Sequence, residues 1–127
     1  MLHEPLAQYL ARVEQAILRC SNADVERYPE EILTPQRANL RIRLRFEQGH
    51  VLEINEAVVV VKDSLVPLDY RCHCQDTHNH VIFRYDSTPH FPGLPNVPHH
   101  KHRSDDVIGC EKPDLEPVVR EAMAAQG

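Results

Sequence analysis

The chain has 127 residues, of which 42% are hydrophobic and 26% are charged, a composition typical of one globular domain spanning residues 1–127. Its formal net charge of −5 at pH 7 argues against a broad surface for binding polyanions, but it allows a local basic site. No apolar run is long enough to cross a membrane, and the first residues lack the pattern of a signal peptide. We therefore expect a cytoplasmic protein with reduced cysteines and no membrane partner.

The first predicted element is an amphipathic helix over residues 5–20. Pro5 suits the first turn of a helix, and the pattern stops at residues 21–22. Residues 24–34 are ambiguous, because Pro29 restricts any strand there to the edge of a sheet. The apolar face of the helix follows spacings of three and four and consists of Leu6, Tyr9, Leu10, Val13, Ile17 and Cys20.

The next two elements form a predicted hairpin. In RANLRIRLRF, apolar residues alternate with arginines, which predicts a strand with one buried face, and VLEINEAVVVV follows after a short turn. We expect a register that pairs Arg45 with Glu53, because opposite charges then face each other across the two strands. In this register Glu56 lies opposite Ile42, on the apolar face.

A second predicted hairpin consists of VPLDYRCHCQ and HVIFRYD, which flank a polar turn at residues 76–79. Closing the strands directly at this turn places Arg71 opposite Arg84. Cys72 and Cys74 share one strand face, and we interpret them as core residues, because no second cysteine pair has the spacing of zinc ligands.

A long segment rich in proline and histidine follows, and then Pro113 and Asp114 open a short helix. The sequence therefore predicts an α+β fold. Its parts are an N-terminal helix, an antiparallel meander sheet of four to five strands, a long ordered Pro/His-rich loop and a short C-terminal helix.

Prolines recur at every third position from residue 89 to residue 98, which is the period of a polyproline II helix. This period predicts an ordered strut whose apolar column, Phe91, Leu94 and Val97, docks on the protein. At about 3.1 Å per residue, His90 and His99 lie about 28 Å apart on a straight strut, so the compact histidine cluster is at residues 98–102. A rigid strap with solvated histidines is the alternative interpretation.

Two kinds of chemistry suit the cluster of His99, His100, Lys101 and His102. Zinc needs three or four ligands, and three histidines followed by two aspartates could supply them. However, adjacent histidines point in different directions on an extended chain, and Lys101 repels a cation. We favour acid–base chemistry on a phosphodiester, since histidine with lysine and arginine can perform it without metal.

Two further features allow both a structural and a functional interpretation. Arg71 and Arg84 form either a fork for a phosphate or a solvated checkerboard with Asp69 and Asp86. Glu56 is either a tolerated edge residue or a carboxylate placed for catalysis.

The run IFRYDSTPHFPGLPNVPHHKH, together with LEINEAVVV and YRCHCQD before it, resembles the TumE family of toxins from bacterial and archaeal type II toxin–antitoxin pairs. The resemblance covers roughly residues 24–105. The family pattern reads FRYDNAPHHPxLPTFPHHKH; here Ser87-Thr88 replaces Asn-Ala, and Phe91 stands where a second histidine is common. The positions that match residue by residue are Arg84, Tyr85, Asp86, His90, His99, His100, Lys101 and His102.

This resemblance implies a growth-inhibiting toxin that a cognate antitoxin neutralises, typically a small helix-turn-helix protein encoded nearby. Many toxins of this size cleave RNA, and on this analogy we predict a metal-independent ribonuclease with no cofactor. Two alternatives stay open. One is a metal-dependent nuclease or hydrolase with zinc or another divalent metal at His99, His100 and His102. The other is a non-catalytic module that binds a protein. Each is compatible with an oligomer.

In the ribonuclease prediction, Arg71 and Arg84 bind the scissile phosphate, and His99 or His100 serves as base and acid. Lys101 stabilises the developing charge. Tyr85 and Asp86 orient these groups, and Glu56 is an alternative base. The predicted catalytic residues are His99, His100, Lys101, Arg84, Tyr85, Asp86 and Glu56, and the predicted substrate-binding residues are Arg71, His73, His90 and His102.

Overall fold

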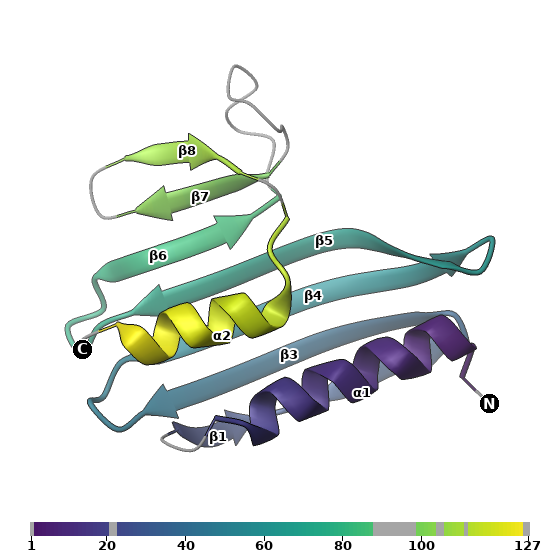
Figure 1. Ribbon diagram of the computed structural model, residues 1–127, viewed down its shortest axis with the longest axis horizontal. Helices are drawn as coiled ribbons and strands as arrows, with labels where there is room; N and C mark the ends of the chain where they lie inside the picture. The colour runs from purple at the N-terminus through teal and green to yellow at the C-terminus, as the bar shows by residue number, and fades with distance from the viewer. Residues whose placement is uncertain (1, 21–22, 88–98, 104–105, 111, 126–127) are drawn as a thin grey trace.

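The computed structural model describes residues 2–20, 23–87, 99–103, 106–110 and 112–125, which form two helices and one large sheet (Figure 1). No described helix is long and apolar enough to cross a membrane. In chain order the elements are α1 (Glu4–Leu18), β1 (Ala23–Arg27), β2 (Glu30–Thr34), β3 (Arg37–Phe46), β4 (Val51–Val61), β5 (Ser64–Gln75), β6 (Val81–Asp86), β7 (His100–Arg103), β8 (Val107–Gly109) and α2 (Leu115–Ala124).

The eight strands lie in the order β1-β3-β4-β5-β6-β7-β8, and β2 also pairs with β3. All of these pairings are antiparallel, as the meander prediction requires. The predicted number of four to five strands is too low. The strands β1 and β2 divide the ambiguous segment 24–34 between them. The sequences of β7 and β8, HKHR and VIG, are too short to show an alternating pattern.

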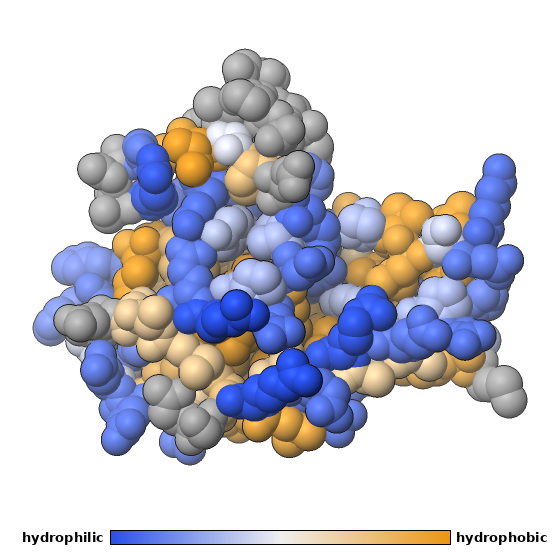
Figure 2. Space-filling model, in the orientation of Figure 1, coloured by the Kyte–Doolittle hydropathy of each residue, from blue (hydrophilic) through white to orange (hydrophobic). Residues whose placement is uncertain are grey.

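Both helices pack on the same face of the sheet (Figure 1), which we call the helix face. Strand β3 shows the division: Leu40, Ile42 and Leu44 are buried on the helix face, whereas Arg41 points to the opposite face. Hydrophilic side chains lie over the two helices in the same view (Figure 2). No described helix covers the opposite face of the sheet, which we call the open face. The predicted N-terminal helix is present but ends two residues earlier than expected, at Leu18 rather than residue 20. All six predicted apolar positions are buried: Leu6, Tyr9, Leu10, Val13, Ile17 and Cys20.

The register of the first hairpin differs from the predicted one by two residues. Glu56 pairs with Leu40 rather than Ile42, because a tight turn closes the strands at Phe46, whose N–H donates to the carbonyl of His50 over 2.9 Å. Gly49 permits this turn with a φ of 98°. A shift of two residues keeps every side chain on its predicted face, so Glu56 is still on the helix face.

The second hairpin is also shifted by two residues. Arg71 pairs with Asp86 and His73 pairs with Arg84, so the predicted pairing of Arg71 with Arg84 is wrong. The turn is longer than its four polar residues indicate. The carboxylate of Asp76 accepts N–H bonds from both residue 78 and residue 80, at 2.8 and 2.9 Å, and this extends the turn to residue 80.

Two predictions are not decided by this architecture, namely the polyproline strut and the single domain. Residues 88–98 lie outside the described residues, so the polyproline strut and its docked column, Phe91, Leu94 and Val97, stay predictions. The single domain over residues 1–127 also stays a prediction. The C-terminal helix, by contrast, is present as α2, and it buries Val118 and Val119 against the sheet.

Substituting Gly49 by alanine tests the first turn. A Cβ atom at this position would lie 2.6 Å from Cγ2 of Thr77 in the neighbouring turn, and the φ of 98° is unfavourable for any residue with a side chain. We expect Gly49→Ala to lower the free energy of unfolding by about 1–3 kcal/mol in a urea titration. Glu47→Ala, an exposed change in the same turn, should alter it by less than about 0.5 kcal/mol. Equal stability of the two variants would show that the turn is not strained.

Candidate functional site

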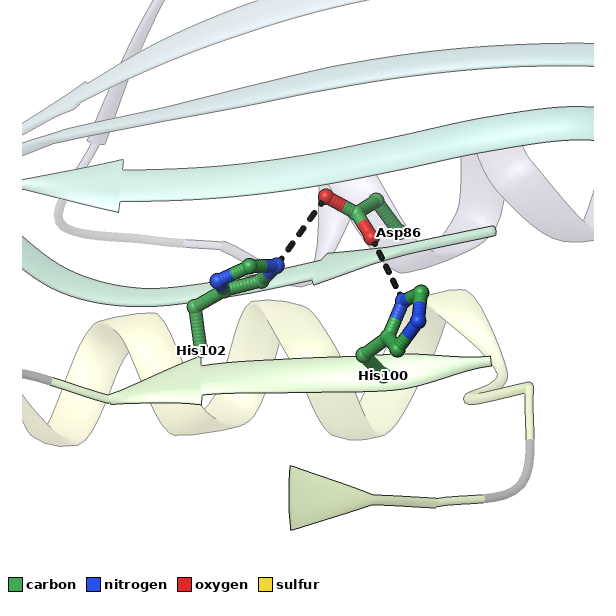
Figure 3. Close-up of side chains that lie close together, drawn as sticks. All are labelled: Asp86, His100 and His102. Atoms are coloured by element: carbon green, nitrogen blue, oxygen red, sulfur yellow. Dashed lines mark hydrogen bonds and ion pairs between the residues drawn. The ribbon is translucent and has the colours of Figure 1, made fainter. Parts of the chain in front are cut away.

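A polar cluster on β6 and β7 is centred on Asp86. The strand register pairs Asp86 with His100 and Arg84 with His102, so these four side chains share the open face. The Oδ1 atom of Asp86 lies 3.0 Å from Nδ1 of His100. Its Oδ2 atom lies 3.4 Å from Nε2 of His102 and 3.3 Å from Nε of Arg84. Figure 3 shows the carboxylate between the two imidazoles, which both turn toward it.

Burial strengthens these interactions. The side chain of Asp86 is 5% exposed and that of His100 is 0% exposed, so the carboxylate is almost withdrawn from water. A buried carboxylate depends on the donors around it, and charge-assisted hydrogen bonds are stronger in such surroundings. Asp86 therefore holds two imidazoles and one guanidinium in fixed relative positions.

Two histidines of the open face have a lowered pKa. Burial disfavours the charged imidazolium of His102 and lowers its pKa, although the nearby Asp86 acts in the opposite direction. Burial also lowers the pKa of His73, whose Nε2 lies 3.0 Å from Oε1 of Gln75. His73 lies on β5 as the register partner of Arg84, so Arg84 stands between His73 and His102. Both imidazoles are therefore mainly neutral at pH 7.

The cluster is accessible from one side. Arg84 and His102 border a hollow of about 700 Å³, which Asn79, His80, Val81 and Arg103 complete. His100 and Asp86 lie behind this surface. A ligand in the hollow would therefore contact Arg84 and His102, while Asp86 and His100 position them.

The structure does not bring Lys101 to this cluster. Lys101 and Tyr85 point to the helix face, where Nζ of Lys101 and the hydroxyl of Tyr85 both donate to Glu121 of α2 over 2.7 Å. The ammonium group also lies 5.0 Å from the centre of the Tyr85 ring. These contacts fasten α2 to β6 and β7. Lys101 and His100 therefore lie on opposite faces, because neighbouring residues of a strand point to opposite sides of the sheet.

His99 and Glu56 belong to a second group on the helix face. Nδ1 of His99 lies 2.9 Å from the hydroxyl of Tyr70, and the two rings are stacked. The carboxylate of Glu56 is 8% exposed and lies 3.0 Å from Nζ of Lys112, which in turn lies 5.0 Å from the centre of the Tyr70 ring. Glu56 is thus a buried, paired carboxylate, and the sheet separates it from Asp86.

The remaining predicted residues are Arg71, His90 and the possible metal ligands. Arg71 is exposed on the open face, next to Asp86 across the strands. His90 lies outside the described residues. For a metal, the ligand atoms that come together, within 4.8 Å of one another, belong to Asp86, His100 and His102. His99 is not part of this set, so a metal bound by His99, His100 and His102 stays a prediction that the described geometry does not support.

Sequence reasoning does not find two residues that hold these groups. Glu121 and Lys112 contact Tyr85, Lys101 and Glu56 from positions far along the chain. Neither belongs to a motif, and no spacing connects them with FRYD or PHHKH. Only the packing of α2 on the helix face reveals their contacts.

The fold, the Asp86 cluster and the runs FRYD and PHHKH belong to a region that matches a known protein family. A family model described as Toxin TumE matches residues 13–125, which include both hairpins, the Asp86 cluster and α2. The protein is thus a toxin component. The chain belongs to the TumE toxin family, as the resemblance predicts, and this membership implies an antitoxin as its partner. No curated protein and no solved structure matches the chain.

Replacing Asp86 by asparagine tests the electrostatics of the cluster. The charge of Asp86 raises the pKa of His102 and partly offsets the effect of burial. Asp86→Asn should therefore lower the pKa of His102 further below the ordinary histidine value of about 6.5. The measurement is an NMR titration of the histidine ring signals. Asp69→Asn, an exposed change on the same face, serves as the control and should leave this pKa unchanged. The same pKa of His102 in both variants would contradict the coupling.

Proposed function

We propose that this toxin inhibits growth by cleaving RNA on the open face of its sheet. In this proposal Arg84 binds the scissile phosphate, and His102 and His73, on either side of it, transfer protons. Asp86 and His100 position these groups. The proposal rests on one observation above all: a buried carboxylate holds Arg84, His100 and His102 within 3.0–3.4 Å, at the border of a hollow.

The reaction needs three groups that this arrangement offers. A base removes the proton of the ribose 2′-hydroxyl, whose oxygen then forms a bond to phosphorus, while the bond from phosphorus to the 5′-oxygen breaks. His102 is suited to accept this proton, because its lowered pKa keeps it neutral. Protonated His73 donates to the leaving 5′-oxygen, and Arg84 stabilises the charge on the phosphate. The products are a 2′,3′-cyclic phosphate and a 5′-hydroxyl end.

The assignment differs from the sequence prediction in its proton-transfer residues. His102 and His73, expected to bind substrate, take the roles first given to His99 and His100. The buried His100 becomes a positioning residue, and Arg84 replaces Lys101 as the source of positive charge. The reason is geometric, since His73, Arg84 and His102 are successive register partners on three adjacent strands.

A metal-dependent hydrolase is the second candidate. The observation in its favour is the set of one carboxylate and two imidazoles within 4.8 Å, which suits zinc and related divalent metals. The observation against it is Arg84, whose Nε lies 3.3 Å from the same Asp86 and repels a cation there. We therefore favour the reaction without metal.

We further propose that the antitoxin is a small helix-turn-helix protein encoded near the toxin gene. The family supports an antitoxin as partner. RNA cleavage would make the cytoplasm the place of action.

Single substitutions in the cluster test RNA cleavage. His102→Ala should lower kcat/KM on a cellular RNA fragment by about 10²–10⁴-fold, because a general base contributes that much. Arg84→Gln should have a similarly large effect through the lost phosphate contact. The wild-type profile of kcat/KM against pH should be bell-shaped. Its maximum should lie below about pH 6.5, because base and acid both titrate below the ordinary histidine pKa.

His78→Ala, an exposed histidine in the turn after β5, is the matched control and should keep full activity. Activity should also survive EDTA. Stoichiometric zinc in the purified protein, with activity lost to chelator and restored by metal, would instead favour the metal-dependent candidate. Full cleavage by His102→Ala would contradict both.

Expression in bacteria tests the biological role. Induction of the wild-type chain alone should arrest growth, and co-expression of the gene beside it should restore growth. The His102→Ala variant, produced at the same level, should not arrest growth. Normal growth with wild-type protein accumulating in folded form would count against toxicity by this chain.

A further inference from the structure

A row of polar side chains crosses the open face and ends at the Asp86 cluster. Arg41 on β3, Asn55 on β4, Arg71 on β5 and Asp86 on β6 are successive register partners. Neighbouring strands lie about 4.8 Å apart, so the row extends about 14 Å from Asp86 to Arg41. It starts beside the hollow proposed for cleavage and runs away from it.

The two arginines of this row differ from Arg43 and Arg45 of β3. Arg41 and Arg71 are exposed, and among the described residues neither has a carboxylate within 4.0 Å. In contrast, Arg43 is paired with Glu26 and Glu53, and Arg45 is paired with Glu26 over 2.7 Å. The positive charge of Arg41 and Arg71 is therefore available to an external anion.

The surface around the row is hollowed. A depression of about 560 Å³ on this face contains Arg41, Asn55 and Arg71 in its lining. Asn39 lies on one flank, with Asp69, whose carboxylate accepts a hydrogen bond from Ser87 over 2.8 Å. No described helix lies over the depression, so a ligand can reach it from solvent.

Carboxylates border the row on both sides. Register places Asp69 in the neighbouring row on one side, and Glu53, which Arg43 already neutralises, in the neighbouring row on the other. Arg41 and Arg71 supply positive charge along this row, and the exposed Arg27 adds a further charge at the edge of the depression. A single phosphate backbone fits this row, whereas the second backbone of a duplex would come close to Asp69, which has no cationic partner within 4.0 Å among the described residues. The net charge of −5 also disfavours any wider polyanion contact.

We propose that Arg41, Asn55 and Arg71 form a track that binds the backbone of single-stranded RNA beside the cleavage site. Arg71 and Arg41 contact successive parts of the phosphate backbone, and Asn55 between them donates to a phosphate or ribose oxygen. This inference rests on the proposed RNA cleavage, but it concerns binding rather than chemistry. It also moves Arg71 from the scissile phosphate to the flanking ones.

Binding to an uncleavable strand tests the track separately from catalysis. The probe is a fluorescein-labelled single-stranded oligonucleotide with 2′-O-methyl ribose throughout, because it has no free 2′-hydroxyl to attack. Fluorescence anisotropy should show that Arg41→Gln and Arg71→Gln each weaken binding by about three- to tenfold. Each should also reduce the slope of log K against log salt by about 0.7, the value for one lost phosphate contact on a single strand.

Two variants of the same face serve as controls. Arg45→Gln removes a charge that Glu26 already neutralises, so it should change affinity by less than about twofold. Asp69→Asn removes a carboxylate from the border and should strengthen binding. Thermal unfolding should show that all four variants are folded. Equal losses from Arg45→Gln and Arg41→Gln would overturn the track, and so would tighter binding of a duplex of the same sequence.

The outcome also separates the two proposals. If Arg41→Gln binds like the wild type while RNA is still cleaved at the cluster, the track is wrong and the proposed function stands. If the arginines bind the probe as expected but His102→Ala cleaves normally, the cleavage site is wrong and the track stands.

Discussion

The carboxylate of Asp86 is the group on which the open-face site depends. It lies at the end of β6 and contacts both histidines that β7 brings to this face, as well as Arg84 on its own strand. Little water reaches it, so its negative charge must be balanced by these neighbours. The short strand β7 has four residues and almost no apolar surface on this side. Its attachment to β6 therefore relies on the backbone ladder, on Asp86, and on the contacts of Lys101 from the other side.

Alternation along β6 and β7 divides one continuous motif between two faces. Arg84 and Asp86 face the site, whereas Tyr85 between them faces α2; in the same way His100 and His102 face the site and Lys101 faces α2. Half of the motif thus supplies the polar cluster, and the other half anchors the strands that carry it. Adjacent charged residues of one motif therefore do not all belong to one site, because half of them serve the opposite face of the sheet.

The sequence predicts structure best where a hydrophobic pattern continues over many residues. The pattern of residues 5–20 predicts α1 and its buried positions, and alternation in β3 predicts which side chains are buried. Registers are less predictable, because they depend on turn geometry: the bonds of Asp76 and the positive φ of Gly49 shift both hairpins by two residues. Because of that shift, the partner of Arg71 on the neighbouring strand is Asp86 rather than Arg84.

The site itself is only partly predictable for a related reason. The motif indicates Arg84, Asp86, His100 and His102, but it cannot separate them from Lys101 and His99 until β7 is known to be a strand. Lys112 and Glu121 lie in the C-terminal part of the chain, and no local sequence pattern predicts their contacts with Glu56, Tyr85 and Lys101. Glu56 was expected on the apolar face, and Lys112 supplies the partner that its burial requires.

The attachment of Lys101 and Tyr85 to Glu121 has a consequence for synthesis on the ribosome. The chain emerges from its N-terminus, so β6 and β7 are made before α2. Until α2 has emerged, the two strands lack the carboxylate that binds them from the helix face, and β7 is held only by its ladder and the Asp86 contacts. The contacts that complete the support of the site therefore form only after the strands of the sheet have left the exit tunnel and α2 has followed them.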